Sequence, residues 1–137
     1  MTQEQKDLLL KDLRARLPYG VWIERKLKSC KFGSKCMLNA FDIYVIERGK
    51  YDFYKPYLFP LSSITEEQKN ELIDLKWSFD NDNSRICNIP ECFGTYRAYV
   101  EHFCCSKLID WFNKNHFDYR GLIPMGLAID ATNKNIY

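Results

Sequence analysis

The apolar residues of this chain change their spacing at Pro18-Tyr19-Gly20, and this change constrains the fold more than any other sequence feature. Before it, apolar residues recur at the three- and four-residue spacing of a helix: Leu9, Leu10, Leu13 and Leu17. Thr2 and Gln5 have the spacing of a capping box, so we expect this helix to run from there to about residue 17. After Gly20, polar and apolar residues alternate up to Lys28, as they do in a strand. The chain is therefore expected to combine helices and strands.

Three strands are predicted between residues 20 and 54. The first covers residues 20–28, where alternation places Val21 and Arg25 on one face and Trp22 on the other. The apolar run 37–46 is expected to be a second, more buried strand, followed by a turn at 47–50 with a glycine at positive φ. Residues 51–54 are expected to return as the third strand. These three would form a small antiparallel sheet.

The middle of the chain predicts a connector and a second helix. Residues 55–60 contain Pro56 and Pro60, which cannot donate to a sheet ladder, so we expect an extended connector and not a central strand. Thr65 and Gln68 form a second capping box, and the helix that it opens should run to about Trp77. The polar residues 80–84 are typical of a loop.

A third helix is predicted over residues 106–115, and whether it begins earlier, near Tyr96, is left open. The glycine-containing segments 121–123 and 126–129 could supply short edge strands. No internal repeat or linker interrupts the chain, and its length suits one domain. The prediction is one α+β domain over residues 1–137, with an antiparallel sheet of three to five strands flanked by about three helices.

The cellular location of the protein is predicted from its composition and its N-terminal residues. No uninterrupted apolar run approaches the roughly 20 residues that span a bilayer. The N-terminus lacks the basic head and apolar region of a signal peptide, so we expect a cytoplasmic protein with no membrane partner. Free thiols are then expected at all six cysteines, which are Cys30, Cys36, Cys87, Cys92, Cys104 and Cys105.

Charge is distributed unevenly between the two parts of the chain. Residues 1–60 contain twelve Lys and Arg against seven Asp and Glu, a surplus of five positive charges. Residues 61–137 contain eight against eleven, a surplus of three negative charges. The positive surplus concentrates between Arg25 and Lys35, where no acidic residue occurs. This asymmetry permits an anionic partner but does not require one.

Three segments together resemble a known group of proteins: residues 6–21, residues 55–68, and the tail His116-Phe-Asp-Tyr-Arg-Gly-Leu-Ile-Pro-Met-Gly-Leu-Ala-Ile-Asp130. They are similar to a family of small uncharacterised proteins found in gut anaerobes, their prophages and other mobile elements. The resemblance covers about half of the chain and assigns no catalytic or binding residue. It implies an accessory protein that binds host proteins or nucleic acid, as inhibitors of bacterial defence nucleases do.

The cysteines and histidines suggest two kinds of chemistry, a zinc site and a cysteine nucleophile. Zinc would need four converging ligands, and the gaps between Cys30 and Cys36 and between Cys87 and Cys92 suit buried thiols better. A nucleophile at Cys104 or Cys105 with His116 and Asp118 lacks any spacing that would bring these residues together. We instead expect the His116–Asp118 segment to cap the third helix, and Asp118 and Arg120 to pair or bond the backbone.

Nucleotide chemistry has no sequence support. The chain contains neither a P-loop nor a dinucleotide-binding glycine motif. The paired carboxylates Glu66 and Glu67 are explained by helix capping, and Asp80 and Asp82 by loop solubility. We therefore expect no cofactor and no enzymatic activity.

A partner-binding surface is the strongest functional candidate. The basic residues 25–35 lie near Trp22, and residues 51–59 hold more aromatics than one core face accepts. We expect a protein partner, with a nucleic-acid-binding regulator using the basic face as the alternative and a homodimer contact left open. The low net charge favours a solvated hairpin, whose lysines protect a strand edge from aggregation, over binding of nucleic acid. The predicted binding residues are Trp22, Arg25, Lys26, Lys28, Lys31, Lys35 and whichever of Tyr51 and Tyr54 faces outward.

Overall fold

The computed structural model describes residues 1–83 and 106–137. Helices and strands are mixed along the chain, so the predicted α+β class is confirmed. In chain order the elements are α1 (Gln3–Arg16), the 3₁₀ turn η1 (Leu17–Tyr19), β1 (Trp22–Leu27), β2 (Ser34–Met37), α2 (Ala40–Glu47), β3 (Tyr51–Leu58), η2 (Leu61–Ser63), α3 (Glu66–Asn83), α5 (Ser106–Lys114) and β4 (Ile129–Asp130).

The sheet has four strands in the order β2-β1-β3-β4. β1 pairs antiparallel with β3, as predicted, and also with β2, which replaces the strand expected at residues 37–46. β3 and β4 are parallel, so the sheet is mixed. A parallel pair requires a long crossover connection, and here α3 and α5 lie between the two strands in the sequence. Of the two expected tail strands, only Ile129 of residues 126–129 lies in β4, and residues 121–123 form no strand.

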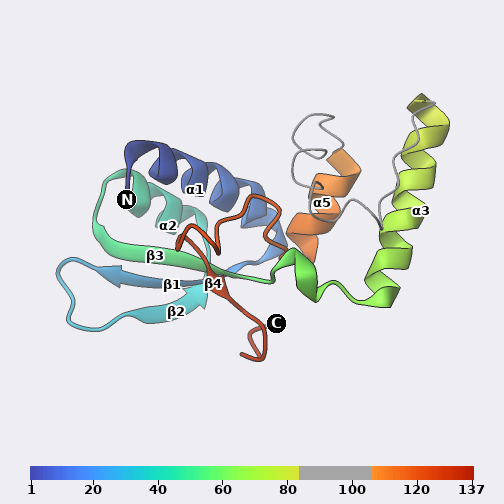
Figure 1. Cartoon of the computed structure of the whole chain (residues 1–137). Helices are drawn as coiled ribbons and strands as arrows, with labels where there is room; N and C mark the ends of the chain where they lie inside the picture. The colour runs from blue at the N-terminus through green and yellow to red at the C-terminus, as the bar shows by residue number, and fades with distance from the viewer. Residues whose placement is uncertain (84–105) are drawn as a thin grey trace.

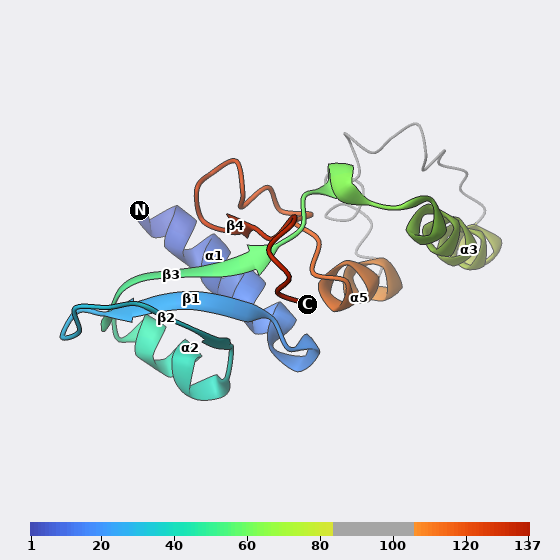
Figure 2. The same cartoon turned by 90° about the horizontal axis from the view of Figure 1, so that it is seen from below.

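Helices α1 and α2 lie on the same side of the sheet (Figures 1 and 2). Their apolar faces and the sheet form one buried cluster, to which the tail contributes Leu122, Leu127 and Ala128. The capping box at Thr2 is formed, and in it the backbone amide of Gln5 donates to the Thr2 hydroxyl at 3.2 Å. Gly20 follows η1 at φ 75°, a left-handed conformation that glycine adopts without strain. The predicted helix-to-strand change is thus confirmed.

The predicted strand over residues 37–46 is wrong, because most of this segment is helix α2. A capping box begins this helix. The Asp42 backbone amide donates to the Asn39 side-chain oxygen, and the Asn39 backbone amide donates to the Asp42 carboxylate, both at 3.0 Å. Gly49 has a positive φ, but it follows the end of α2 and does not form a hairpin turn. A short apolar run fits a strand or a buried helix equally well, and the capping box decides between them.

The predicted connector at residues 55–60 is also wrong in part, because β3 continues through Pro56 to Leu58. The Leu58 carbonyl accepts from the Ala131 amide, on the β4 side of the strand. Peptide groups two residues apart face the same side, so the Pro56 nitrogen also faces β4. β4 pairs only with Tyr57 and Leu58, so this nitrogen has no ladder partner to lose.

The helices beyond the sheet form a second buried cluster, in which α3 and α5 pack with Phe117 and Tyr119 (Figure 1). The capping box at Thr65 and Gln68 is formed, as predicted. α3 extends to Asn83, past the predicted end at Trp77, so residues 80–83 are not the expected loop. No proline or glycine interrupts residues 66–83, which explains this continuation. α5 begins at Ser106, and the possible start near Tyr96 lies outside the described residues.

The residues after α5 connect the buried cluster of the sheet with the buried cluster of α3 and α5. The Asp118 carboxylate accepts from the backbone amides of Leu122 and Ile123 at 2.8 Å. His116 has φ 62° just after α5, and the Phe117 backbone amide donates to the Phe112 carbonyl at 2.9 Å, which closes the end of the helix. The expected capping role of this segment is therefore confirmed. Arg120 pairs with Asp12 of α1 at 3.2 Å and not with Asp118.

The imidazole of His116 lies flat against the ring of Tyr137, with 3.6 Å between centroids and 9° between planes. The Tyr137 hydroxyl accepts from the Trp22 amide and donates to the Tyr57 carbonyl, so it bridges β1 and β3. Burial, and to a smaller extent the charge of Arg16, lowers the pKa of His116 from its ordinary 6.5 to about 4. The folded protein therefore holds this ring neutral.

Acidification is expected to destabilise the protein through His116. Between about pH 6.5 and about pH 4 the unfolded chain binds a proton that the folded state does not, so stability falls as the pH falls through this window. Because the ring is only half-buried, we expect a loss of about 1–2 kcal/mol. Urea unfolding across this window measures it. In the His116→Asn variant, whose asparagine tolerates positive φ, this contribution should disappear, and an unchanged pH slope would contradict the assignment.

Candidate functional site

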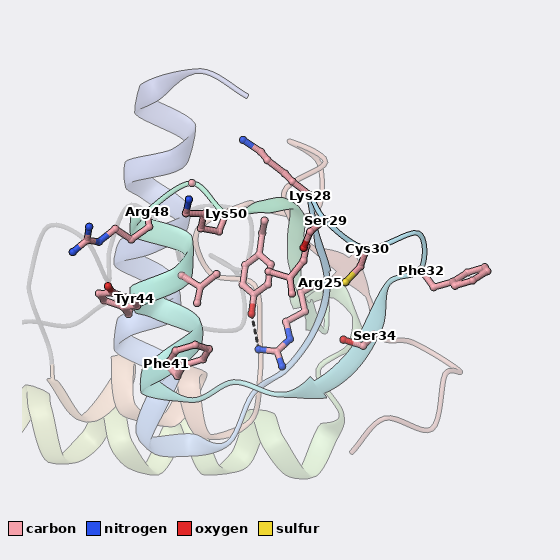
Figure 3. Close-up of a pocket in the computed structure, with 14 residues that line it drawn as sticks. Arg25, Lys28, Ser29, Cys30, Phe32, Ser34, Phe41, Tyr44, Arg48 and Lys50 are labelled. Atoms are coloured by element: carbon pink, nitrogen blue, oxygen red, sulfur yellow. Dashed lines mark hydrogen bonds between the residues drawn. The ribbon is translucent and has the colours of Figure 1, made fainter.

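A groove of about 840 Å³ lies between α2 and the hairpin formed by β1 and β2 (Figure 3). The Lys28 amide donates to the Lys50 carbonyl at 3.1 Å, which joins the hairpin to the segment after α2 at one end of the groove. The groove is lined by Arg25, Leu27, Lys28, Ser29, Cys30, Phe32, Ser34, Phe41, Tyr44, Val45, Arg48, Gly49, Lys50 and Tyr51.

The Arg25 side chain extends from β1 toward α2, and a hydrogen bond fixes its guanidinium group there (Figure 3). Its Nη1 donates to the Tyr51 hydroxyl at 2.7 Å and forms an ion pair with the carboxylate of Asp42. The Tyr51 hydroxyl in turn donates to Asp42 at 2.7 Å. Burial raises the pKa of Tyr51, and the charge of Arg25 offsets only part of this rise. Tyr51 therefore stays protonated and orders the guanidinium and the carboxylate.

Exposed aromatic side chains border the groove. Phe41 is 68% exposed and Tyr44 is 51% exposed, and the two rings stack with 6.2 Å between their centroids. Phe32 is 85% exposed and points outward from the tip of the hairpin (Figure 3). Among the described residues, seven large hydrophobic side chains are exposed, and Leu27 with these three aromatics makes four of them. This concentration at one groove is typical of an interaction site.

The groove is also cationic. Arg25, Lys28, Arg48 and Lys50 line it, and no acidic side chain of the described residues does. Lys28, Arg48 and Lys50 form no ion pair with any residue in the described part of the chain, and the Arg48 guanidinium lies 5.0 Å from the centre of the Tyr44 ring. Lys28 and Arg48 extend outward from opposite sides of the groove (Figure 3). The arrangement favours an anionic ligand that also has apolar groups.

The structure brings only part of the predicted binding surface together. Arg25, Lys28 and Tyr51 line the groove. Lys31 and Lys35 are exposed on the hairpin but do not line the groove. The other predicted residues lie elsewhere: half-buried Trp22, Lys26, which pairs with Asp52 at 3.0 Å, and Tyr54 in the core.

The expectation that Tyr51 or Tyr54 faces outward is wrong, because both are buried. Between Lys26 and Leu27 of β1, the pairing with β3 shifts its register. As a result, Tyr51 and Tyr54 of β3 both lie on the face that packs against the helices. Strict alternation would have placed these two residues on opposite faces. The exposed aromatics of the protein lie instead on α2 and on the hairpin tip.

Sequence reasoning missed Phe41, Tyr44 and Arg48, because residues 37–46 were expected to be a strand. On a helix, Phe41, Tyr44 and Arg48 follow one another at three- and four-residue spacing and share one face. The signal that could have found them is the Asn39–Asp42 capping box, which predicts the helix on which they lie.

Neither a zinc site nor a cysteine nucleophile with its partners is assembled within the described residues. Cys30 is exposed and Cys36 is half-buried, whereas the four remaining cysteines lie outside the described residues. No group of three or more metal-ligating side chains is present in residues 1–83 and 106–137. His116 and Asp118, the residues considered as partners of a cysteine nucleophile, contact Tyr137 and the backbone, respectively.

Within the same described ranges, no helix combines the length and the apolar character that crossing a membrane requires. No family model, no curated protein and no solved structure matches this chain.

Proposed function

We propose that this protein is a non-catalytic binding protein of the cytoplasm, whose groove holds an acidic segment of a partner protein. The observation that carries this proposal is the occurrence of exposed aromatic side chains and unpaired cations along one groove. Aromatic residues and arginine dominate the binding energy of protein interfaces. None of the lining residues in the described part of the chain is acidic, which supports a partner of negative charge.

The resemblance to proteins of prophages and mobile elements supports a host protein as the partner. Inhibition of a defence nuclease is one specific form of this function. A cationic groove would be repelled by the basic surface with which a nuclease holds its nucleic acid. The inhibitor would therefore contact an acidic region of the nuclease.

Nucleic-acid binding is the second candidate, because the same residues would suit a single strand. Lysine and arginine contact phosphates, and exposed aromatic rings stack on bases. Phe41 and Tyr44 stack against each other, however, which leaves less ring surface for bases. The ion pair between Arg25 and Asp42 also reduces the charge available to a polyanion.

The first experiment purifies the tagged full chain from a bacterial lysate with and without nuclease treatment. A stoichiometric protein that survives nuclease, and whose binding weakens only modestly with salt, would support the proposal. Loss of all bound material with nuclease, and a steep decrease of affinity with salt, would support the nucleic-acid candidate instead. Light scattering on the same sample measures homodimer formation.

Alanine at Phe41 or Tyr44 is expected to weaken binding of the captured partner about thirtyfold, as loss of an interface hot spot does. Both side chains are exposed, so the free energy of unfolding should change by less than about 0.5 kcal/mol. Isothermal titration calorimetry measures the affinity. Met37→Ala is the matched control, because Met37 is 46% exposed but does not line the groove. Equal effects of all three substitutions would reject the groove as the binding site.

A further inference from the structure

Arg25 differs from the other cations of the groove because its position is fixed. Its Nη1 is held by the Tyr51 hydroxyl and the buried Asp42 carboxylate, whereas its Nη2 and Nε have no partner among the described residues. The side chain remains 24% exposed. A guanidinium ordered on one edge loses little conformational entropy when the other nitrogens bind an anion.

The surroundings of Arg25 define which anion fits. Leu27 and Val45 provide apolar groove surface, and Phe41 and Tyr44 add aromatic surface. Lys28, Arg48 and Lys50 add positive charge without a competing carboxylate among the lining residues. A ligand that satisfies both features carries an anionic group next to an apolar one.

We propose that the groove recognises a carboxylate attached to an apolar group, with Nη2 and Nε of Arg25 as its anchor. This inference rests on the proposed function, in which the carboxylate belongs to an acidic side chain of the partner segment. Two guanidinium nitrogens match the two oxygens of a carboxylate in parallel hydrogen bonds. Because Asp42 already neutralises part of the Arg25 charge, a singly charged carboxylate suits the anchor better than a doubly charged phosphate.

The probes are three small molecules: 4-phenylbutyrate, the uncharged 4-phenylbutanol, and phenyl phosphate. Titration of the ¹⁵N-labelled full chain, followed by NMR, measures their affinities and the residues whose resonances shift. We expect 4-phenylbutyrate to shift resonances of Arg25, Phe41 and Tyr44 and to bind about tenfold more tightly than the alcohol.

The matched variant is Arg25→Lys, which keeps a positive charge beside Asp42 but removes the planar nitrogens. It should lose the tenfold preference for the acid, whereas Lys11→Gln on the exposed surface of α1 should keep it. Near-UV circular dichroism shows whether the variants retain the fold, and Arg25→Gln provides a second test. Equal binding of acid and alcohol, no binding of either, a preference that survives Arg25→Lys, or tighter binding of phenyl phosphate would each overturn the proposal.

The captured partner separates failure of this inference from failure of the proposed function. If Phe41→Ala and Tyr44→Ala weaken partner binding but Arg25→Lys does not, the groove is the binding site and the Arg25 anchor is wrong. If none of the three substitutions weakens binding, both proposals fail. A tenfold or greater loss in Arg25→Lys, together with the preference for 4-phenylbutyrate, supports both.

Discussion

Asp12→Ala is expected to lower the free energy of unfolding by about 3–5 kcal/mol, because it leaves two buried guanidinium groups without a counter-charge. Asp12 and Arg16 are fully buried, and Arg120 is nearly so. The Asp12 carboxylate lies 2.7 Å from Nε of Arg16 and 3.2 Å from Nε of Arg120. Both guanidinium groups also lie over the ring of Tyr119, at 5.3 and 4.9 Å from its centre.

Loss of this ion-pair cluster should destabilise the whole protein, because the cluster connects distant parts of the chain. Arg16 belongs to α1 and donates from Nη2 to the Phe117 carbonyl at 2.7 Å, so the cluster joins the sheet layer to the residues after α5. Without Asp12, two like charges would lie buried next to Tyr119 with no counter-charge from Asp12. The ion pairs of Asp12 therefore stabilise the contact between the two buried hydrophobic clusters of the protein.

Urea unfolding of the full chain measures the effect of Asp12→Ala. Asp12→Asn keeps the size of the side chain, so a similar loss in that variant assigns the effect to charge and not to packing. Asp7→Asn, at an exposed position of the same helix, is the matched control and should change the free energy by less than about 0.5 kcal/mol. An Asp12→Asn variant as stable as this control would show that the ion pairs contribute nothing.

Asp42→Ala is expected to cost about 3–4 kcal/mol, because one buried carboxylate serves three partners. It accepts from the Asn39 amide at the start of α2, accepts from the Tyr51 hydroxyl at 2.7 Å, and pairs with Arg25. Removing it breaks one of the two hydrogen bonds of the α2 capping box and leaves the buried Tyr51 hydroxyl without its acceptor. The side of the groove formed by α2 and the position of Arg25 both depend on this residue.

Asp52→Ala is the matched control for Asp42→Ala. Asp52 pairs with Lys26 at 3.0 Å in the same part of the sheet, but its side chain is 53% exposed. A surface pair of this kind contributes less than about 1 kcal/mol. Urea unfolding and far-UV circular dichroism compare the two variants. If Asp42→Ala is no more destabilising than Asp52→Ala, the structural role assigned to the buried carboxylate is wrong.

The groove depends on these same buried contacts. Arg25 is positioned by Asp42 and Tyr51, and Phe41 and Tyr44 lie on the helix whose capping box includes Asp42. Substitutions at the exposed aromatics should therefore change binding alone, whereas substitutions at Asp42 should change binding and stability together. This difference separates residues that contact the partner from those that support the contact surface.

The sequence by itself determined those elements whose signals are local. The Thr2–Gln5 and Thr65–Gln68 capping boxes and the change of spacing at Gly20 predicted two helices and the first strand, and the structure confirms all three. Helix α2 was not predicted, although its capping box is equally local, because its short apolar run fits a strand as well. The stretch of Arg25 and lysines was recognised as a candidate site from charge alone.

Only the tertiary structure decided which of these residues meet. Pro56 lies in β3 because β4 leaves its side of the strand unpaired, which the residues near Pro56 do not reveal. The shifted pairing between β1 and β3 buries both Tyr51 and Tyr54. The groove joins β1, the hairpin and α2, so its composition depends on contacts between segments and not on the sequence of any one segment. Side-chain pairing across such distances is set by packing of the whole core, and hydrophobic periodicity carries no information about it.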